Sequence, residues 1–131
     1  RTAECAGVDA IVIPERGSAQ INSDAVKTSA GALNYLPVAR VKNLFYACRD
    51  LQKMGLALVA VTEKTELIMY EADLSSPVAL VLGSEEDGIS QEIMGIVDQK
   101  VKIPMAGKIE SLNVSVSAGV AIYEVIRQRK N

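Results

Sequence analysis

Short apolar runs alternate with helix-like stretches from one end of this chain to the other. The runs are apolar on both faces, which is typical of strands buried between two layers of helices. They occupy residues 8–14, 36–41, 56–62, 77–82 and 99–103. This alternation predicts an α/β fold whose mostly parallel sheet carries helices on both faces.

Helix signals lie between and after these runs. Asn43 is expected to cap a helix whose apolar residues share one face, and Ser90 is expected to cap a shorter helix. The predicted helices cover residues 25–32, 44–54, 90–97 and 111–129. A chain of 131 residues is long enough for one domain with one core.

Composition excludes several classes of function. The sequence contains no histidine, so a Ser-His-Asp hydrolase and a His-ligated metal site are both excluded. The formal net charge is −2, so a polyanionic partner must be held by a local basic patch. Cys5 and Cys48 lie in apolar surroundings and are expected to be buried free thiols, which suits a reducing cytoplasm. No apolar run is long enough to span a bilayer, so no membrane association is expected.

Three loops follow predicted strands, at residues 62–64, 83–88 and 104–107. Ligands of open parallel sheets bind beyond the carboxyl ends of the strands, so these loops are candidate binding segments. The two glycines of the second loop allow a ligand to approach the backbone closely. Its three consecutive acids disfavour a pyrophosphate, and it lacks the lysine of a phosphate-binding loop. Taken alone, this loop is an ordinary strand-to-helix turn.

The start of the last predicted helix, residues 111–117, is rich in small polar side chains. Helix propensity disfavours so many serines and asparagines. Contact with a ligand or a closely packed backbone would explain them. A cap at Ser111 followed by small residues for helix packing explains them equally well.

Residues 80–89, LVLGSEEDGI, resemble the second motif of the SpoU-class (TrmH-like) RNA 2′-O-ribose methyltransferases of the SPOUT superfamily. Residues 103–105 and 111–116 look like the third motif, and residues 1–3 with 7–10 look like the tail of the first. The resemblance covers essentially the whole chain, with the motifs in the family's order. The residues of these motifs are most similar to those of the 23S rRNA guanosine 2′-O-methylating branch.

The resemblance implies a deep trefoil knot in the C-terminal third and S-adenosylmethionine as cofactor. A pattern argument could not predict a knot, because knots are nearly absent from proteins. The cofactor carries a sulfonium cation and no phosphate, so an acidic loop beside it is tolerated. The matching residues expected to bind it are Thr62, Leu82, Gly83, Ile103, Met105 and Leu112.

The resemblance also implies a set of catalytic residues: Arg1, Glu85, Ser111 and Asn113. The family's first-motif arginine has been assigned removal of the 2′-hydroxyl proton. A guanidinium rarely gives up its own proton, so we expect Arg1 to clamp a phosphate and stabilise negative charge. Ser111 and Asn113 would orient the ribose, and Glu85 would position neighbouring polar groups.

The family pattern carries expectations about organisation and partners. Residues 1–131 would form a catalytic domain without its first strand, the first-motif asparagine and glycine, and the N-terminal RNA-binding domain of many members. The expected partners are RNA, with rRNA favoured over tRNA, and a second copy of the chain in a homodimer. No metal is expected, and the expected location is the cytoplasm.

Two alternatives stay open on sequence grounds. A flavodoxin-like or receiver-type signalling domain would need acids at the first strand end and after the third strand. Pro14 and Thr62 stand at these places, which disfavours this alternative. The other alternative keeps the SPOUT fold but lacks turnover, as a module that binds the cofactor or RNA.

Overall fold

The computed structural model describes residues 1–15, 35–84, 87–109 and 112–129. The chain divides into two compact units, Arg1–Ala47 and Cys48–Asn131. The helix expected over residues 25–32 lies outside the described residues. In the part of the chain that is described, no helix combines the length and the apolar character needed to cross a membrane.

The first unit contains a short helix and a parallel pair of strands. Helix α1 (Thr2–Cys5) ends in a turn at Gly7, whose φ of 78° favours glycine. Strands β1 (Ile11–Pro14) and β2 (Val38–Val41) pair in parallel, with Ile11 opposite Val38. The predicted start of the first strand at residue 8 is wrong, because the Val8 amide donates to the α1 carbonyl of Ala3.

The two cysteines have different surroundings. Cys5 is exposed, so the prediction of a buried thiol is wrong there; α1 has only one turn and no buried residue. Cys48 lies on helix α3 (Leu44–Lys53) and is buried, as predicted. Burial raises the pKa of the Cys48 thiol. The helix begins where the Asn43 side chain accepts the Phe45 amide at 2.9 Å, which confirms the predicted cap.

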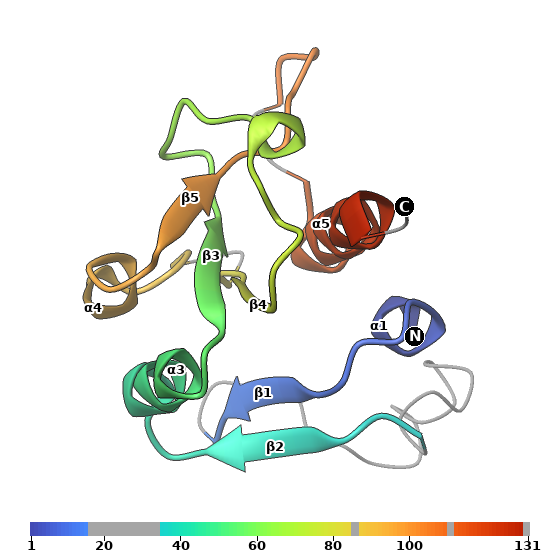
Figure 1. Cartoon of the computed structure of the whole chain (residues 1–131). Coiled ribbons are helices and arrows are strands. Elements are labelled where there is room, and N and C mark those ends of the chain that lie inside the picture. Colours follow the sequence, from blue (N-terminus) through green and yellow to red (C-terminus); the bar gives the residue numbers. More distant parts are fainter. Residues whose placement is uncertain (16–34, 85–86, 110–111, 130–131) are drawn as a thin grey trace. The chain divides into compact units, whose positions relative to one another are not determined.

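The second unit is built on a three-stranded parallel sheet with the order β4–β3–β5 (Figure 1). The strands are β3 (Ala57–Val61), β4 (Val78–Val81) and β5 (Gln99–Val101). Ala57 pairs with Val78 on one side of β3, and Val59 pairs with Gln99 on the other. The three middle residues of the central strand β3 are buried, as expected for an apolar strand between two layers.

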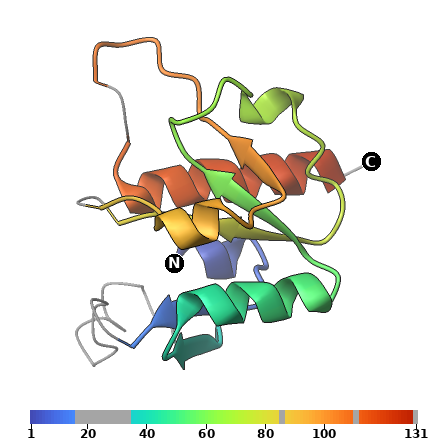
Figure 2. The same ribbon diagram turned by 90° about the vertical axis from the view of Figure 1, so that its left-hand side faces the viewer.

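Helices cover both faces of this sheet, as predicted. Helix α5 (Val114–Arg129) lies on one face and α4 (Gln91–Met94) on the other (Figures 1 and 2). On the α5 side, the helix and the sheet share a core with the segment around the short helix η2 (Met69–Glu71). Its buried members are Val59, Met69, Ala72, Leu74, Val101, Ala121 and Val125.

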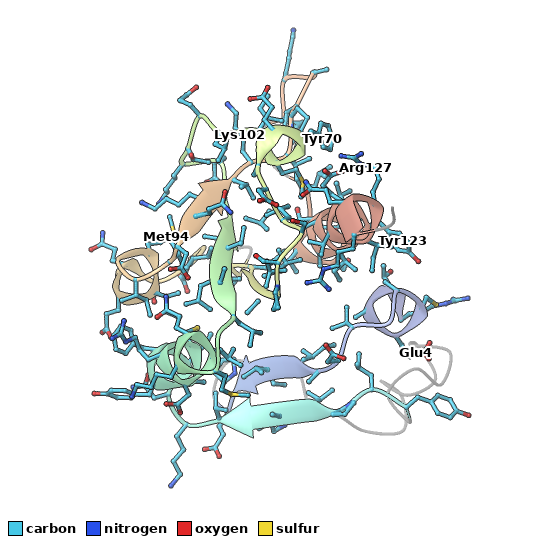
Figure 3. All side chains as sticks on the ribbon, viewed as in Figure 1. Glu4, Tyr70, Met94, Lys102, Tyr123 and Arg127 are labelled. Atoms are coloured by element: carbon cyan, nitrogen blue, oxygen red, sulfur yellow. The ribbon has the colours of Figure 1, made fainter. Side chains whose placement is uncertain are left out.

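A buried carboxylate fastens α5 to this segment. Glu124 is only 6% exposed, and Arg127 donates to both of its oxygens, at 2.7 and 2.8 Å. This hydrogen-bonded guanidinium lowers the pKa of Glu124. Gln128 donates to Glu124 and to the Ala72 carbonyl, and accepts the Leu74 amide at 2.7 Å. The network fixes the C-terminal half of α5, where Figure 3 labels Arg127 and Tyr123.

Candidate functional site

A pocket of about 410 Å³ opens at the carboxyl ends of β3 and β5, within the second unit. This is the edge where ligands of parallel sheets bind. In Figure 2 the chain leaves β5, extends beyond the strands and approaches the start of α5. The lining residues come from the end of β3, the chain after β5 and helix α5. They are Val61, Thr62, Glu63, Lys102, Ile103, Met105, Gly107, Ile109 and Ser117.

Backbone hydrogen bonds hold the two loops of the pocket side by side. The Thr62 amide donates to the Val101 carbonyl at 2.9 Å. Further along, the Lys102 amide donates to Leu67 at 2.8 Å, and the Met69 amide donates to Lys102 at 2.9 Å. The chain after β3 therefore returns to pair with the chain after β5, with Ile68 opposite Lys102. This pairing gives the pocket a fixed wall.

The wall combines apolar, hydroxyl and charged side chains. Val61, Ile103, Met105 and Ile109 supply apolar surface, and Ile109 is 78% exposed. Apolar surface of this kind suits a flat aromatic ligand. Lys102 forms an ion pair with Glu66, in which the N···O distance is 3.7 Å and Glu66 is fully exposed. Exposed pairs of this kind contribute about 0–1 kcal/mol, so this one is easily broken.

The glycine loop after β4 is closed on itself. The Gly88 amide donates to the Ser84 carbonyl at 3.0 Å, and the Asp87 amide donates to the Ser84 hydroxyl at 3.0 Å. A Cβ on Gly83 would overlap backbone atoms of Gly88 and Ile89, and Gly88 has a φ of 68°. Both glycines are therefore required by the backbone of this loop.

The start of α5 differs from the prediction. The helix begins at Val114 rather than at residue 111, and Asn113 supplies its cap. The Asn113 side-chain oxygen accepts the Val116 amide at 2.9 Å and the Ser115 hydroxyl at 3.1 Å. Asn113 is exposed, so capping leaves its amide nitrogen accessible to a ligand.

The structure brings three of the predicted site residues together in the pocket, namely Thr62, Ile103 and Met105. Leu82, Gly83, Leu112 and Asn113 are described but are not among its lining residues. Glu85 and Ser111 lie outside the described residues, and Arg1 is exposed at the start of α1 in the first unit. The roles of these residues stay predictions.

Several lining residues were not predicted individually. Glu63 and Gly107 lie in loops that the strand pattern had marked, and Ser117 lies in the small polar stretch. Lys102 and Ile109 carried no sequence signal, because a lysine or isoleucine after a strand is commonplace. Among the residues that the structure describes, no cluster of acidic or cysteine side chains could hold a metal ion.

Comparison with known proteins identifies the family. The model of the SpoU rRNA Methylase family matches residues 1–123. The chain belongs to this family. The resemblance of its motifs is thereby confirmed, and the receiver-type alternative is set aside.

Two curated relatives of this SpoU chain share one name. The 23S rRNA (guanosine-2′-O-)-methyltransferase RlmB of Xanthomonas axonopodis pv. citri is 49% identical over 129 residues. The protein of the same name from Vibrio parahaemolyticus is 40% identical over 129 residues. Each match covers 98% of this chain and 52% of the relative. The chain therefore spans about half the length of these relatives.

Solved SpoU structures have the same fold. A TrmH/SpoU tRNA modifying enzyme of A. aeolicus superposes with a TM-score of 0.87 at 33% identity, covering 98% of this chain and 66% of that one. AviRb of Streptomyces viridochromogenes, a SpoU methyltransferase in complex with the cofactor AdoMet, superposes with a TM-score of 0.86 at 28% identity. This match covers 98% of this chain and 51% of AviRb. An AdoMet-bound rRNA methyltransferase of Sinorhizobium meliloti superposes with a TM-score of 0.90 at 26% identity. This match covers 100% of this chain and 50% of that one.

Proposed function

We propose that this chain is the catalytic domain of an S-adenosylmethionine-dependent methyltransferase that methylates a ribose 2′-hydroxyl in ribosomal RNA. One observation carries the proposal: in a SpoU chain, Thr62, Ile103 and Met105 line one pocket at the carboxyl ends of β3 and β5. The names of the 23S rRNA relatives favour rRNA, whereas one solved neighbour is named as a tRNA modifying enzyme.

The pocket fits the proposed cofactor. About 410 Å³ falls within the usual range for small-molecule sites, and the apolar wall suits an adenine ring. The acids of the 83–88 loop are compatible with a ligand that has a sulfonium and no phosphate. When bound, the cofactor supplies an electrophilic methyl group. Thr62 and Met105 would form its wall, and backbone groups around Gly83, Ile103 and Leu112 would hold the adenosyl group, with Leu82 as a further binding residue.

The other site residues would prepare the substrate. A neutral hydroxyl is a poor nucleophile, so its proton must leave and the resulting charge must be stabilised. Arg1 would clamp a substrate phosphate and stabilise this charge, as a guanidinium does well. Ser111 and Asn113 would orient the ribose, with Glu85 positioning neighbouring polar groups. Correct placement of the oxygen supplies much of the rate enhancement.

The finer features of the family pattern belong to this proposal as well. The loops at residues 83–88 and 103–111 would form the trefoil knot, with α5 tucked behind them. The enzyme would act as a homodimer in the cytoplasm. Val116 and Tyr123 are exposed apolar side chains seven residues apart on α5, so they share one helix face, which supports coverage of this face by another copy.

A methyl-transfer assay tests the function. The protein is incubated with tritium-methyl S-adenosylmethionine and 23S rRNA, and the labelled nucleotide is then mapped. The expected product resists alkaline cleavage at the labelled position, because the 2′-hydroxyl is blocked. Label on a base would overturn the ribose assignment. Cofactor binding without any transfer would favour the module that lacks turnover.

A further inference from the structure

Two side chains give the pocket its formal charge. Among its described lining residues, only Glu63 and Lys102 have formally charged side chains. Glu63 follows β3 and Lys102 follows β5, so they come from the two loops that the backbone holds together. Figure 3 labels Lys102 near the end of β5. The pocket therefore presents one positive and one negative group beside an otherwise apolar and hydroxyl-bearing wall.

Lys102 is well placed to receive a carboxylate. Its backbone is fixed on both sides, by the amide that donates to Leu67 and the carbonyl that accepts from Met69. Its side chain is 30% exposed, and its ion pair with Glu66 is long, at 3.7 Å, and open to solvent. A carboxylate that enters the pocket can replace Glu66 with little loss.

We propose that Lys102 binds the α-carboxylate, and Glu63 the α-ammonium, of the amino-acid end of bound S-adenosylmethionine. The inference rests on the proposed function. The cofactor has a flat aromatic adenine and a zwitterionic amino-acid end, which matches a wall that carries both apolar side chains and two opposite charges. Because both charged contacts lie at the amino-acid end, they also fix the direction in which the ligand lies.

Calorimetry at pH 7.5 with three ligands tests the assignment. S-adenosylhomocysteine carries both charges, its decarboxylated analogue carries only the ammonium, and 5′-methylthioadenosine carries neither. None of them has a sulfonium, so the cofactor's sulfur cannot account for a difference.

Lys102→Met is expected to weaken the binding of S-adenosylhomocysteine about fivefold and to leave the affinities of the other two ligands unchanged. Glu63→Gln is expected to weaken the binding of S-adenosylhomocysteine and of the decarboxylated analogue by a similar factor. The affinity for 5′-methylthioadenosine should not change.

Two control variants accompany the test. Lys100→Met removes an exposed lysine of β5 that does not line the pocket, and it should change none of the three affinities. Lys102→Arg keeps the charge and should keep S-adenosylhomocysteine binding within about twofold.

Equal losses for all three ligands would overturn the inference and leave the cofactor site intact. Unchanged S-adenosylhomocysteine affinity with weakened RNA binding in Lys102→Met would assign this lysine to the substrate instead, and would also overturn it. Failure of the unmodified protein to bind any of the three ligands would overturn the proposed function itself.

Discussion

Gly83 and Gly88 determine the shape of the loop after β4, because neither has a side chain that would restrict its backbone. At Gly83 the backbone passes so close to Gly88 that a Cβ does not fit, and Gly88 itself adopts a left-handed conformation. These constraints arise from the closed loop, in which Gly88 donates to the Ser84 carbonyl. The loop geometry thus accounts for glycines that the sequence pattern alone treated as an ordinary turn.

Gly83→Ala is expected to lower the free energy of unfolding by about 1–3 kcal/mol, because the backbone must move to make room. Urea unfolding measures this. The matched control is Gly95→Ala, since a Cβ at Gly95 meets its nearest atom at an ordinary 3.4 Å. The control should change the stability by less than about 0.5 kcal/mol. Equal effects of the two substitutions would contradict the close approach at Gly83.

Asn113 has two separable roles. As the cap of α5 it stabilises the helix by about 1 kcal/mol, and as a proposed substrate residue it supports transfer. Asn113→Ala should remove both, lowering methyl transfer at least about tenfold while the fold is kept.

Asn113→Ser distinguishes the two roles. Serine caps helices as well as asparagine does, so this variant should keep its melting temperature but still lose transfer. Full activity in the serine variant would show that Asn113 matters only as a cap.

At the scale of elements, two strands of the second unit were predicted to within one residue at each end. Residues 56–62 and 77–82 correspond to β3 (Ala57–Val61) and β4 (Val78–Val81). Their apolar runs were informative because both faces of these strands are covered. The helix predicted to residue 97 ends at Met94 instead, since the Ile96 amide donates to the Ile93 carbonyl, only three residues back.

The site was predictable in its loops but not in all its side chains. Thr62 and Met105 follow strands, so position along the sheet marked them. Lys102 enters the pocket because the chain from Leu67 to Met69 returns to pair beside it, a long-range contact that local patterns do not encode. Glu124 is buried for a similar reason, since its partner Gln128 reaches across to Ala72 and Leu74.

The attachment of α5 makes stability depend on pH. The pKa of Glu124 is lowered from 4.5 by its hydrogen bond from Arg127. A carboxyl with a depressed folded-state pKa stabilises the fold above its unfolded pKa, and this contribution is lost as the pH falls through the folded value. Glu124→Gln should therefore reduce stability at pH 7 and flatten the decline of stability below about pH 4.5.

Urea unfolding at pH 7 and at pH 3.5 measures this difference. Part of the decline should persist in the variant, because hydrogen bonds from Ser75 also lower the pKa of Asp73. Glu71→Gln, which removes an exposed carboxylate on η2, is the control. A Glu124 variant that declines as steeply as the unmodified protein would show that this carboxylate does not contribute to the pH dependence.

At the scale of the whole molecule, the net charge of the chain has the same sign as the charge of its proposed RNA partner. The chain has 14 Lys and Arg against 16 Asp and Glu, yet the proposed substrate is a polyanion. Attraction between net charges cannot account for binding, so specific cations must contact specific phosphates. In the proposed function Arg1 is one of these cations, and its contribution is visible in the response to salt.

RNA affinity should fall steeply as salt rises, because each phosphate contact releases bound counterions. Arg1→Gln should reduce the slope of log K against log [KCl] by about 1, as expected for the loss of one phosphate contact. The control is Arg49→Gln: Arg49 is an exposed arginine of α3 that donates to Gln52 at 3.3 Å, and its removal should leave the slope unchanged. Filter binding from 50 to 300 mM KCl to an rRNA fragment measures both slopes. Equal slopes for Arg1→Gln and the unmodified protein would mean that Arg1 holds no phosphate, and the stabilising charge would then have to come from another residue.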